Sequence, residues 1–203
     1  MFVLTADQRD SRSHPDLVEK ALRDIRRLAP KDEVFGPERT VGDELQLATA
    51  DAATALTVAL HLTRSHPEPA TSWSVGIGIG PVEPVAAGRS IREARGAAFI
   101  HARAAVERAK RTTHSFAVEG GPRAHAAEAL IGLLLEVRSK RTDKGWEVYD
   151  LLSEGLAQQQ IAARLGITSS AVSLRAKAAG LAAEREAVPI LVQVLRAADD
   201  VSR

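Results

Sequence analysis

Alternating segments of apolar and polar residues along positions 1–120 predict a domain that mixes strands and helices. Short apolar runs predict strands, and longer stretches with apolar residues every three or four positions predict helices. The expected strands cover residues 1–6, the two arms of a hairpin within 34–49, 73–82 and 116–118, and the expected helices cover 16–28, 52–63 and 96–111. The order β-α-β-β-α-β, followed by a helix and a strand, predicts an α+β fold with a ferredoxin-like, split βαβ layout.

The remainder of the chain shows helical spacing. Gly120-Gly121-Pro122 marks a linker, so residues 1–120 are expected to form one domain, 121–142 a connecting segment and 143–203 an all-α domain. The connecting helix, 124–140, places Leu130, Leu133, Leu134 and Val137 on one side. The last helix, 185–198, carries an apolar stripe of Ile190, Leu191, Val194 and Leu195. We expect this stripe to pack on the helix-turn-helix, with a dimer contact as the alternative.

Residues 158–177, QQQIAARLGITSSAVSLRAK, have the spacing of a helix-turn-helix. Ala162 allows close approach of the second helix, Gly166 supplies a left-handed turn, and Thr168 supplies an N-cap for the helix that would enter the DNA major groove. An ordinary helical hairpin is the alternative. The expected DNA-contacting residues lie in and just before that second helix: Thr168, Ser169, Ser170, Ser173, Arg175 and Lys177.

Composition narrows the setting in which such a protein works. The chain has no cysteine, which excludes disulfides and thiolate metal sites and predicts a cytoplasmic location. No apolar run approaches membrane-spanning length, so no membrane contact is expected. The net charge is +1, and from Arg138 onward 10 Lys or Arg face 8 Asp or Glu. Affinity for double-stranded DNA must therefore come from local charge placement and from dimerisation.

Two carboxylates in the first domain are candidate metal ligands. Asp7 follows the first strand and Asp43 lies at the hairpin tip, and these strands are neighbours in a split βαβ sheet. Converging carboxylates can hold Mg²⁺, which in turn holds phosphate oxygens. The alternative is that Asp43 is a turn residue and that Asp7 caps the next segment.

Glycines and arginines add two further features. Trp73, Val75, Ile77 and Ile79 share one strand face, while Gly76, Gly78 and Gly80 occupy the other and predict the close approach of a helix or a ligand. Arg89, Arg92 and Arg95 form a cluster that could contact a triphosphate, although a solvated basic loop is an equal alternative.

Four segments in order resemble the class III nucleotidyl cyclases. Asp7, Arg9 and Ser11 match an Asp-x-Arg-x-Ser segment after the first strand, and residues 39–43, RTVGD, resemble the cyclase hairpin Lys-Thr-Ile-Gly-Asp. Residues 75–80, VGIGIG, are similar to the strand with a Val-Gly-Ile segment. Gly96 with His101-Ala102-Arg103 resembles the Asn-x-Ala-x-Arg helix. The start of the chain, the segment 42–46 and the terminal helix-turn-helix also resemble the SatD-like family.

The resemblance implies a homodimer with nucleotide at the subunit interface and Mg²⁺ on Asp7 and Asp43. The nucleotide-binding residues that it implies, together with the arginine cluster, are Gln8, Arg9, Asp10, Ser11, Arg12, Arg39, Gly42, Arg89, Arg92, Arg95 and Arg103. Two positions depart from the cyclases. Phe99 stands where an active cyclase has Asn, and Arg39 stands where adenylyl cyclases have the base-selecting Lys.

These features predict a transcriptional regulator that binds DNA as a homodimer and responds to ATP or a related purine nucleotide with Mg²⁺. The first domain would then be a catalytically degenerate sensor. One alternative is an active nucleotidyl cyclase coupled to DNA binding. The other is a DNA-binding protein whose first domain is only a dimerisation scaffold.

Overall fold

The computed structural model describes residues 1–29, 34–64, 73–83 and 90–200 of the chain, and its fold is α+β, as predicted. Its elements are β1 (Phe2–Gln8), α1 (Val18–Leu28), β2 (Val34–Arg39), β3 (Glu44–Thr49), α2 (Ala52–Leu62), β4 (Trp73–Ile79), the 3₁₀ helix η2 (Ile91–Glu93), α3 (Ala97–Ala109), β5 (Phe116–Glu119), α4 (Ala124–Ser139), α5 (Asp143–Ser153), α6 (Gln158–Leu165), α7 (Ser169–Ala178) and α8 (Leu181–Asp200). Arg89 and the segment 65–72 lie outside the described residues.

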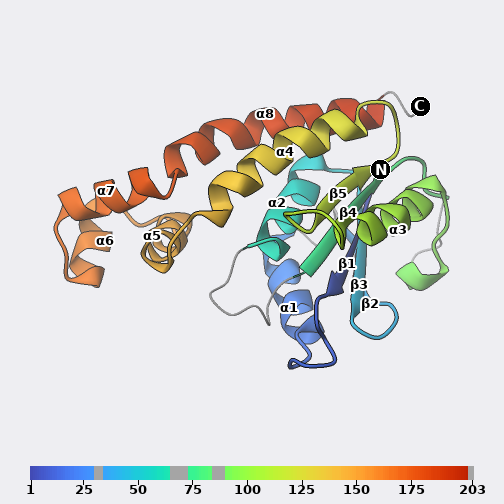
Figure 1. The fold of residues 1–203 in the computed structure, drawn as a ribbon, viewed down its shortest axis with the longest axis horizontal. Helices are drawn as coiled ribbons and strands as arrows, with labels where there is room; N and C mark the ends of the chain where they lie inside the picture. The colour runs from blue at the N-terminus through green and yellow to red at the C-terminus, as the bar shows by residue number, and fades with distance from the viewer. Residues whose placement is uncertain (30–33, 65–72, 84–89, 201–203) are drawn as a thin grey trace.

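A five-stranded mixed sheet organises the first part of the chain. Its order is β2-β3-β1-β4-β5, in which β1 is antiparallel to β3 and β4, and β4 is parallel to β5. Helices α1 and α2 lie on one face of the sheet and α3 on the other (Figure 1). Successive side chains of a strand point to opposite faces of the sheet. The main core lies between one of these faces and α1, α2, α4 and α8.

The glycines of β4 are there because α3 approaches closely, which confirms the expectation from their spacing. A Cβ atom on Gly76 would lie 2.2 Å from the backbone nitrogen of Val106, and one on Gly78 would lie 2.1 Å from that of Ala102. No side chain fits in that space. Trp73, on the opposite face, packs in the main core with its strand neighbours.

Helices α4 and α8 run side by side along the molecule (Figure 1), and two predictions about them are wrong. Leu191 and Leu195 of α8 are buried in the main core with α2 and α4, so the stripe does not pack chiefly on α6 and α7, the predicted helix-turn-helix. On α4, Leu134 of the predicted side is buried together with Ile131 and Leu135, whereas Leu133 of that side is 66% exposed. Apolar residues surround α4 so completely that periodicity alone could not identify its buried face.

A buried ionic cluster joins α4, α5 and α8. The Glu184 carboxylate accepts hydrogen bonds from the guanidiniums of Arg138 and Arg141, and the side chains of all three are at most 7% exposed. Arg138 also donates to the carbonyl oxygen of Leu60 on α2, at 2.8 Å. The centre of the Trp146 ring lies 4.3 Å from the guanidinium carbon of Arg141. This cluster therefore links α2 of the first domain to the helices that follow it.

Candidate functional sites

Asp7 and Asp43 lie at neighbouring strand ends, as the sequence predicts. Asp7 pairs with Glu44 in the β1–β3 register, and the amide of Gln8 donates to the carbonyl oxygen of Asp43 at 3.1 Å. Asp43 accepts a hydrogen bond from the hydroxyl of Ser11, in the loop that follows β1. The two carboxylates are thus carried by adjacent backbone segments on the edge where β1 ends and β3 begins.

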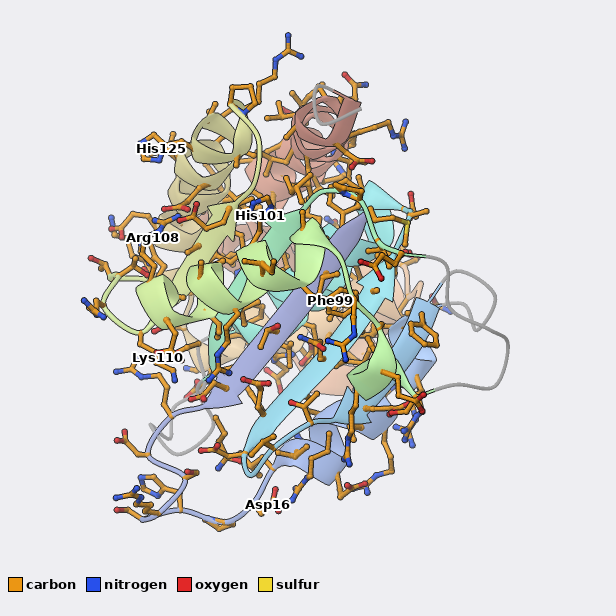
Figure 2. The ribbon with its side chains drawn as sticks, turned by 90° about the vertical axis from the view of Figure 1, so that its right-hand side faces the viewer. Asp16, Phe99, His101, Arg108, Lys110 and His125 are labelled. Carbon is orange, nitrogen blue, oxygen red and sulfur yellow. The ribbon has the colours of Figure 1, made fainter. Side chains whose placement is uncertain are left out.

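A cationic end of α3 reaches the same edge. Figure 2 shows Lys110 at the end of that helix, and its ammonium lies 3.1 Å from the carboxylate of Asp7. Burial disfavours the charged form of Lys110, but hydrogen bonds with Glu107 and Asp7 outweigh it and raise the pKa of Lys110. Arg103, also on α3, forms an ion pair with Glu44. Cations of α3 therefore pair with Asp7 and Glu44, whereas Asp43 accepts a hydrogen bond from the Ser11 hydroxyl.

The described residues contain no group of three or more His, Asp or Glu side chains arranged to hold a metal ion. Mg²⁺ is, however, commonly bound by one or two carboxylates together with phosphate oxygens and water. The donor set of Asp7 and Asp43 fits this mode, provided that the ion displaces Lys110 and Ser11 from the carboxylates. Any bound Mg²⁺ would thus need the phosphate oxygens of a ligand to complete its coordination.

The segment after β1 divides its side chains between different parts of the molecule. Gln8 is 2% exposed, and its carboxamide ties the segment to α1 through the carbonyl of Pro15 and the amide of Leu17. Arg9 instead reaches Ser115, to whose hydroxyl it donates at 3.0 Å. Asp10 adopts a left-handed backbone conformation with φ of 53°, and Arg12 is exposed. In this segment it is Ser11 whose side chain donates a hydrogen bond to the carboxylate of Asp43.

The predicted arginines beside the hairpin contact each other and α1. Arg39 forms a two-oxygen ion pair with Asp16, at 2.6 and 2.5 Å, and this hydrogen bonding lowers the pKa of Asp16. The Nε of Arg92 donates to the carbonyl of Arg39 at 2.9 Å, while Arg95 is exposed. Gly42 at the hairpin tip has φ of 61°, the left-handed conformation expected for a glycine there. Arg39 and Arg92 therefore lie together, and Asp16 would compete with a nucleotide for Arg39.

Helices α5, α6 and α7 form a separate small core. Ile161, Ala162 and Val172 are buried in it with Val148 and Leu151 of α5. Gly166 ends α6 in the left-handed conformation, with φ of 63°. The hydroxyl of Thr168 accepts from the amide of Ala171 at 3.1 Å and caps α7. All three local predictions for the turn are confirmed, because they concern backbone geometry that neighbouring residues determine.

The outer face of α7 differs from the predicted one at two positions. Thr168, Ser169, Ser170, Ser173 and Lys177 are exposed. Arg175 is half-buried and pairs with Glu147 of α5 at 3.2 Å, so its guanidinium is held against α5. Leu174, which the sequence did not single out, is 68% exposed between Ser173 and Lys177. The exposed face of α7 therefore includes an apolar side chain, Leu174, in addition to the predicted serines and Lys177.

No described helix is long and apolar enough to cross a membrane. In comparisons with known proteins, no protein-family model, no curated protein and no solved structure matches the chain. The function must therefore be inferred from the chemistry of the residues described above.

Proposed function

We propose that the chain is a homodimeric, DNA-binding transcriptional regulator that responds to ATP or a related purine nucleotide bound with Mg²⁺. The observation that carries the proposal is the geometry from α6 to α7. A left-handed glycine and a hydroxyl cap set the second helix against the first, as a helix-turn-helix requires. The second helix then presents small polar side chains and Lys177 on its exposed face, which is the kind of surface that enters a major groove.

The strand arrangement supports a nucleotide-binding first domain. The order β2-β3-β1-β4, with β1 antiparallel to both neighbours, is that of a ferredoxin-like sheet, the layout expected from the resemblance to cyclases. Asp7 and Asp43 lie where that resemblance places the metal ligands. Mg²⁺ held there would neutralise phosphate charge, and the cationic groups of α3, now paired with Asp7 and Glu44, would become available to the ligand.

Phe99 favours binding over turnover. Its ring packs against the small cluster of Val3, Ala48 and Ile91 on the α3 side of the sheet (Figure 2). An apolar ring at this position cannot hydrogen-bond a ribose hydroxyl, which is what the resemblance expects of an Asn there. We therefore favour a sensor over an enzyme, and an assay for cyclic nucleotide from ATP or GTP distinguishes the two.

Nucleotide can control DNA binding only by favouring one arrangement of the dimer over another. In a dimer the two α7 helices must meet half-sites separated by one or two turns of DNA. A ligand at the subunit interface that fixes the relative orientation of the first domains would fix that separation. The buried hydrogen bonds of Arg138, Arg141 and Glu184 join the first domain of each chain to the helices that follow it.

The experiment is calorimetric titration of the full chain with ATP, dATP, GTP and cyclic dinucleotides, each with and without Mg²⁺. We expect micromolar, Mg²⁺-dependent binding of a purine nucleotide. Asp43→Ala should abolish this binding without changing the melting temperature by more than a few degrees, since the half-exposed side chain contributes little packing. Glu186→Ala, which removes an exposed carboxylate of α8, is the matched control and should bind normally.

DNA binding is tested separately, by selection of bound duplexes from a randomised pool with and without the nucleotide found in the titration. An imperfect palindrome is the expected product. Binding of nucleotide without enrichment of any duplex would refute the regulator. Enrichment without binding of any nucleotide would leave the first domain as a dimerisation scaffold.

A further inference from the structure

A small basic cavity lies on the opposite side of the β1 end from the Asp43 contact of Ser11. Its volume is about 160 Å³. The cavity is formed where the ends of β1 and α2, the start of β4, the loop before β5 and one side of α4 meet, and its lining includes Arg9, Arg64, Trp73, His114 and Ser115. Among the described residues no carboxylate lines it, although Glu136 lies 3.4 Å from the imidazole of His114 and Asp150 pairs with Arg64. Two guanidiniums, an imidazole and several hydroxyls therefore face this space.

Arg9 lines this cavity, although its side chain is exposed to solvent. Its Nη1 donates to the Ser115 hydroxyl at 3.0 Å, across 106 positions of sequence. A serine hydroxyl satisfies one donor of a guanidinium but neutralises none of its charge. Arg9 is thus a solvated cation at the cavity, and no carboxylate of the described residues forms an ion pair with it.

Arg64 brings a second guanidinium, which belongs to a larger cationic cluster. It donates two hydrogen bonds to Asp150 of α5, at 2.7 and 2.9 Å, and its guanidinium carbon lies 4.4 Å from the centre of the Trp146 ring. The three guanidiniums around that ring, those of Arg64, Arg138 and Arg141, are paired with only two carboxylates, Asp150 and Glu184. The junction therefore carries an excess of positive charge.

The same cluster has hydrogen-bond donors without acceptors. The Nε atoms of Arg64 and Arg138 and the Nη1 of Arg141 are buried and find no partner among the described residues. A buried N–H without an acceptor costs about 1–3 kcal/mol, and more when it is charged. Excess charge and unmatched donors both indicate that an acceptor bearing negative charge belongs close to this junction.

We propose that the cavity binds a small oxyanion of the phosphate class, held between Arg9 and Arg64 with the Ser115 hydroxyl. The cavity is partly open to solvent, and its volume of about 160 Å³ is sufficient to admit a tetrahedral oxyanion. The planar guanidinium is the side chain best suited to such a ligand, because its N–H groups match the spacing of phosphate oxygens. The site needs no Mg²⁺ and is separate from the proposed metal ligands.

Occupancy of this site would change a contact between the two parts of the chain. Arg64 follows α2, and its partner Asp150 lies on α5, which packs directly against α6 and α7. An oxyanion competes with Asp150 for the guanidinium of Arg64 and so weakens this connection. The binding site itself stands independently of the proposed function, whereas an effect of the oxyanion on DNA affinity rests on it.

The chain provides its own probes for the test. It has two tryptophans, of which Trp73 lines the cavity and Trp146 stacks on Arg64. Inorganic phosphate, titrated into the full chain without Mg²⁺ at constant ionic strength, should give a saturable change in tryptophan fluorescence. Arg9→Gln should weaken binding about tenfold or more, as loss of a charge-assisted contact predicts. Arg23→Gln, an equal change of charge at an exposed position of α1 that belongs to no proposed site, should have no effect.

Each possible result of this titration either supports or contradicts the proposed oxyanion site. Saturable phosphate binding that survives Asp43→Ala and is lost in Arg9→Gln supports the proposal, and competition by ATP in Asp43→Ala would show that a nucleotide phosphate can also occupy the site. A linear response to phosphate, or equal weakening by Arg9→Gln and Arg23→Gln, would overturn it. Binding of ATP alone, lost in Asp43→Ala and with no phosphate binding, would also overturn it while supporting the metal–nucleotide site.

Discussion

Replacing Glu184 tests how the two parts of the chain are joined. Its carboxylate accepts hydrogen bonds from two arginines, and no water reaches the cluster freely, since Glu184 is 7% exposed, Arg138 3% and Arg141 0%. Glu184→Gln keeps the size and one acceptor but removes the negative charge. Two guanidiniums then remain buried without a counter-charge, although their bonds to the carbonyls of Leu60 and Ala179 persist.

The magnitude follows from the cost of breaking a buried ion pair by removing one partner, which is about 3–5 kcal/mol. For a chain of 203 residues, each kcal/mol lowers the melting temperature by roughly 2–4 °C. Glu184→Gln should therefore melt about 6–20 °C below the unmodified chain. Replacing both arginines by methionine and Glu184 by leucine removes the buried charges altogether, so this triple variant should melt above the single one.

Thermal unfolding followed by circular dichroism measures this difference, and tryptophan fluorescence reports on Trp146 within the cluster. Glu186→Gln, an exposed position on the same helix, is the control and should change stability by no more than about 0.5 kcal/mol. A melting temperature for Glu184→Gln within 2 °C or so of the control would refute the view that this carboxylate balances two buried charges.

Three other perturbations have defined outcomes. Lys177→Ala should weaken binding of the selected DNA and reduce the slope of log K against log salt by about 1, whereas Lys20→Ala on α1 should leave the slope unchanged. Gly78→Ala places a Cβ atom 2.1 Å from the α3 backbone and should lower the free energy of unfolding, measured in urea, by about 1–3 kcal/mol or more. Gly132→Ala, which has no atom within 4 Å of the new Cβ, should raise the free energy of unfolding by roughly 0.5–1 kcal/mol. Burial lowers the pKa of His61, so the unfolded chain takes up a proton first and stability should fall as pH drops below 6.5; a His61→Gln variant with the same pH dependence of melting would contradict this.

The features that the sequence predicted correctly are those that local chemistry determines. The hairpin tip at Gly42, the left-handed turn at Gly166 and the cap at Thr168 each depend on a residue type at a fixed offset in the chain. The alternate glycines of β4 likewise predicted that another segment approaches one face of this strand closely, and that segment is α3. The α+β class followed from the order of strand and helix patterns along the chain, and the structure has a five-stranded mixed sheet.

The features that could not be predicted join distant segments. Arg9 belongs to a segment that resembles a phosphate loop, and nothing near it in the chain indicates that Ser115 would draw it to the other side of β1. The buried face of α4 and the partner of α8 were equally hidden, because apolar residues occur on most sides of both helices. Which face of each helix is buried depends on tertiary packing, because the apolar residues of the sequence are similar on several faces.

The packing of α8 changes how a signal could pass through the molecule. If its stripe had covered only α5, α6 and α7, the two parts of the chain would have been connected mainly by the linker and α4. Instead Leu191 and Leu195 enter the core of the first domain, while Leu181 packs with the small core around α6 and α7. One helix therefore contributes to both cores, and Pro189 lies within it between Leu181 and Leu191. A ligand that reorients two such first domains in a dimer would reorient both copies of α7 with them.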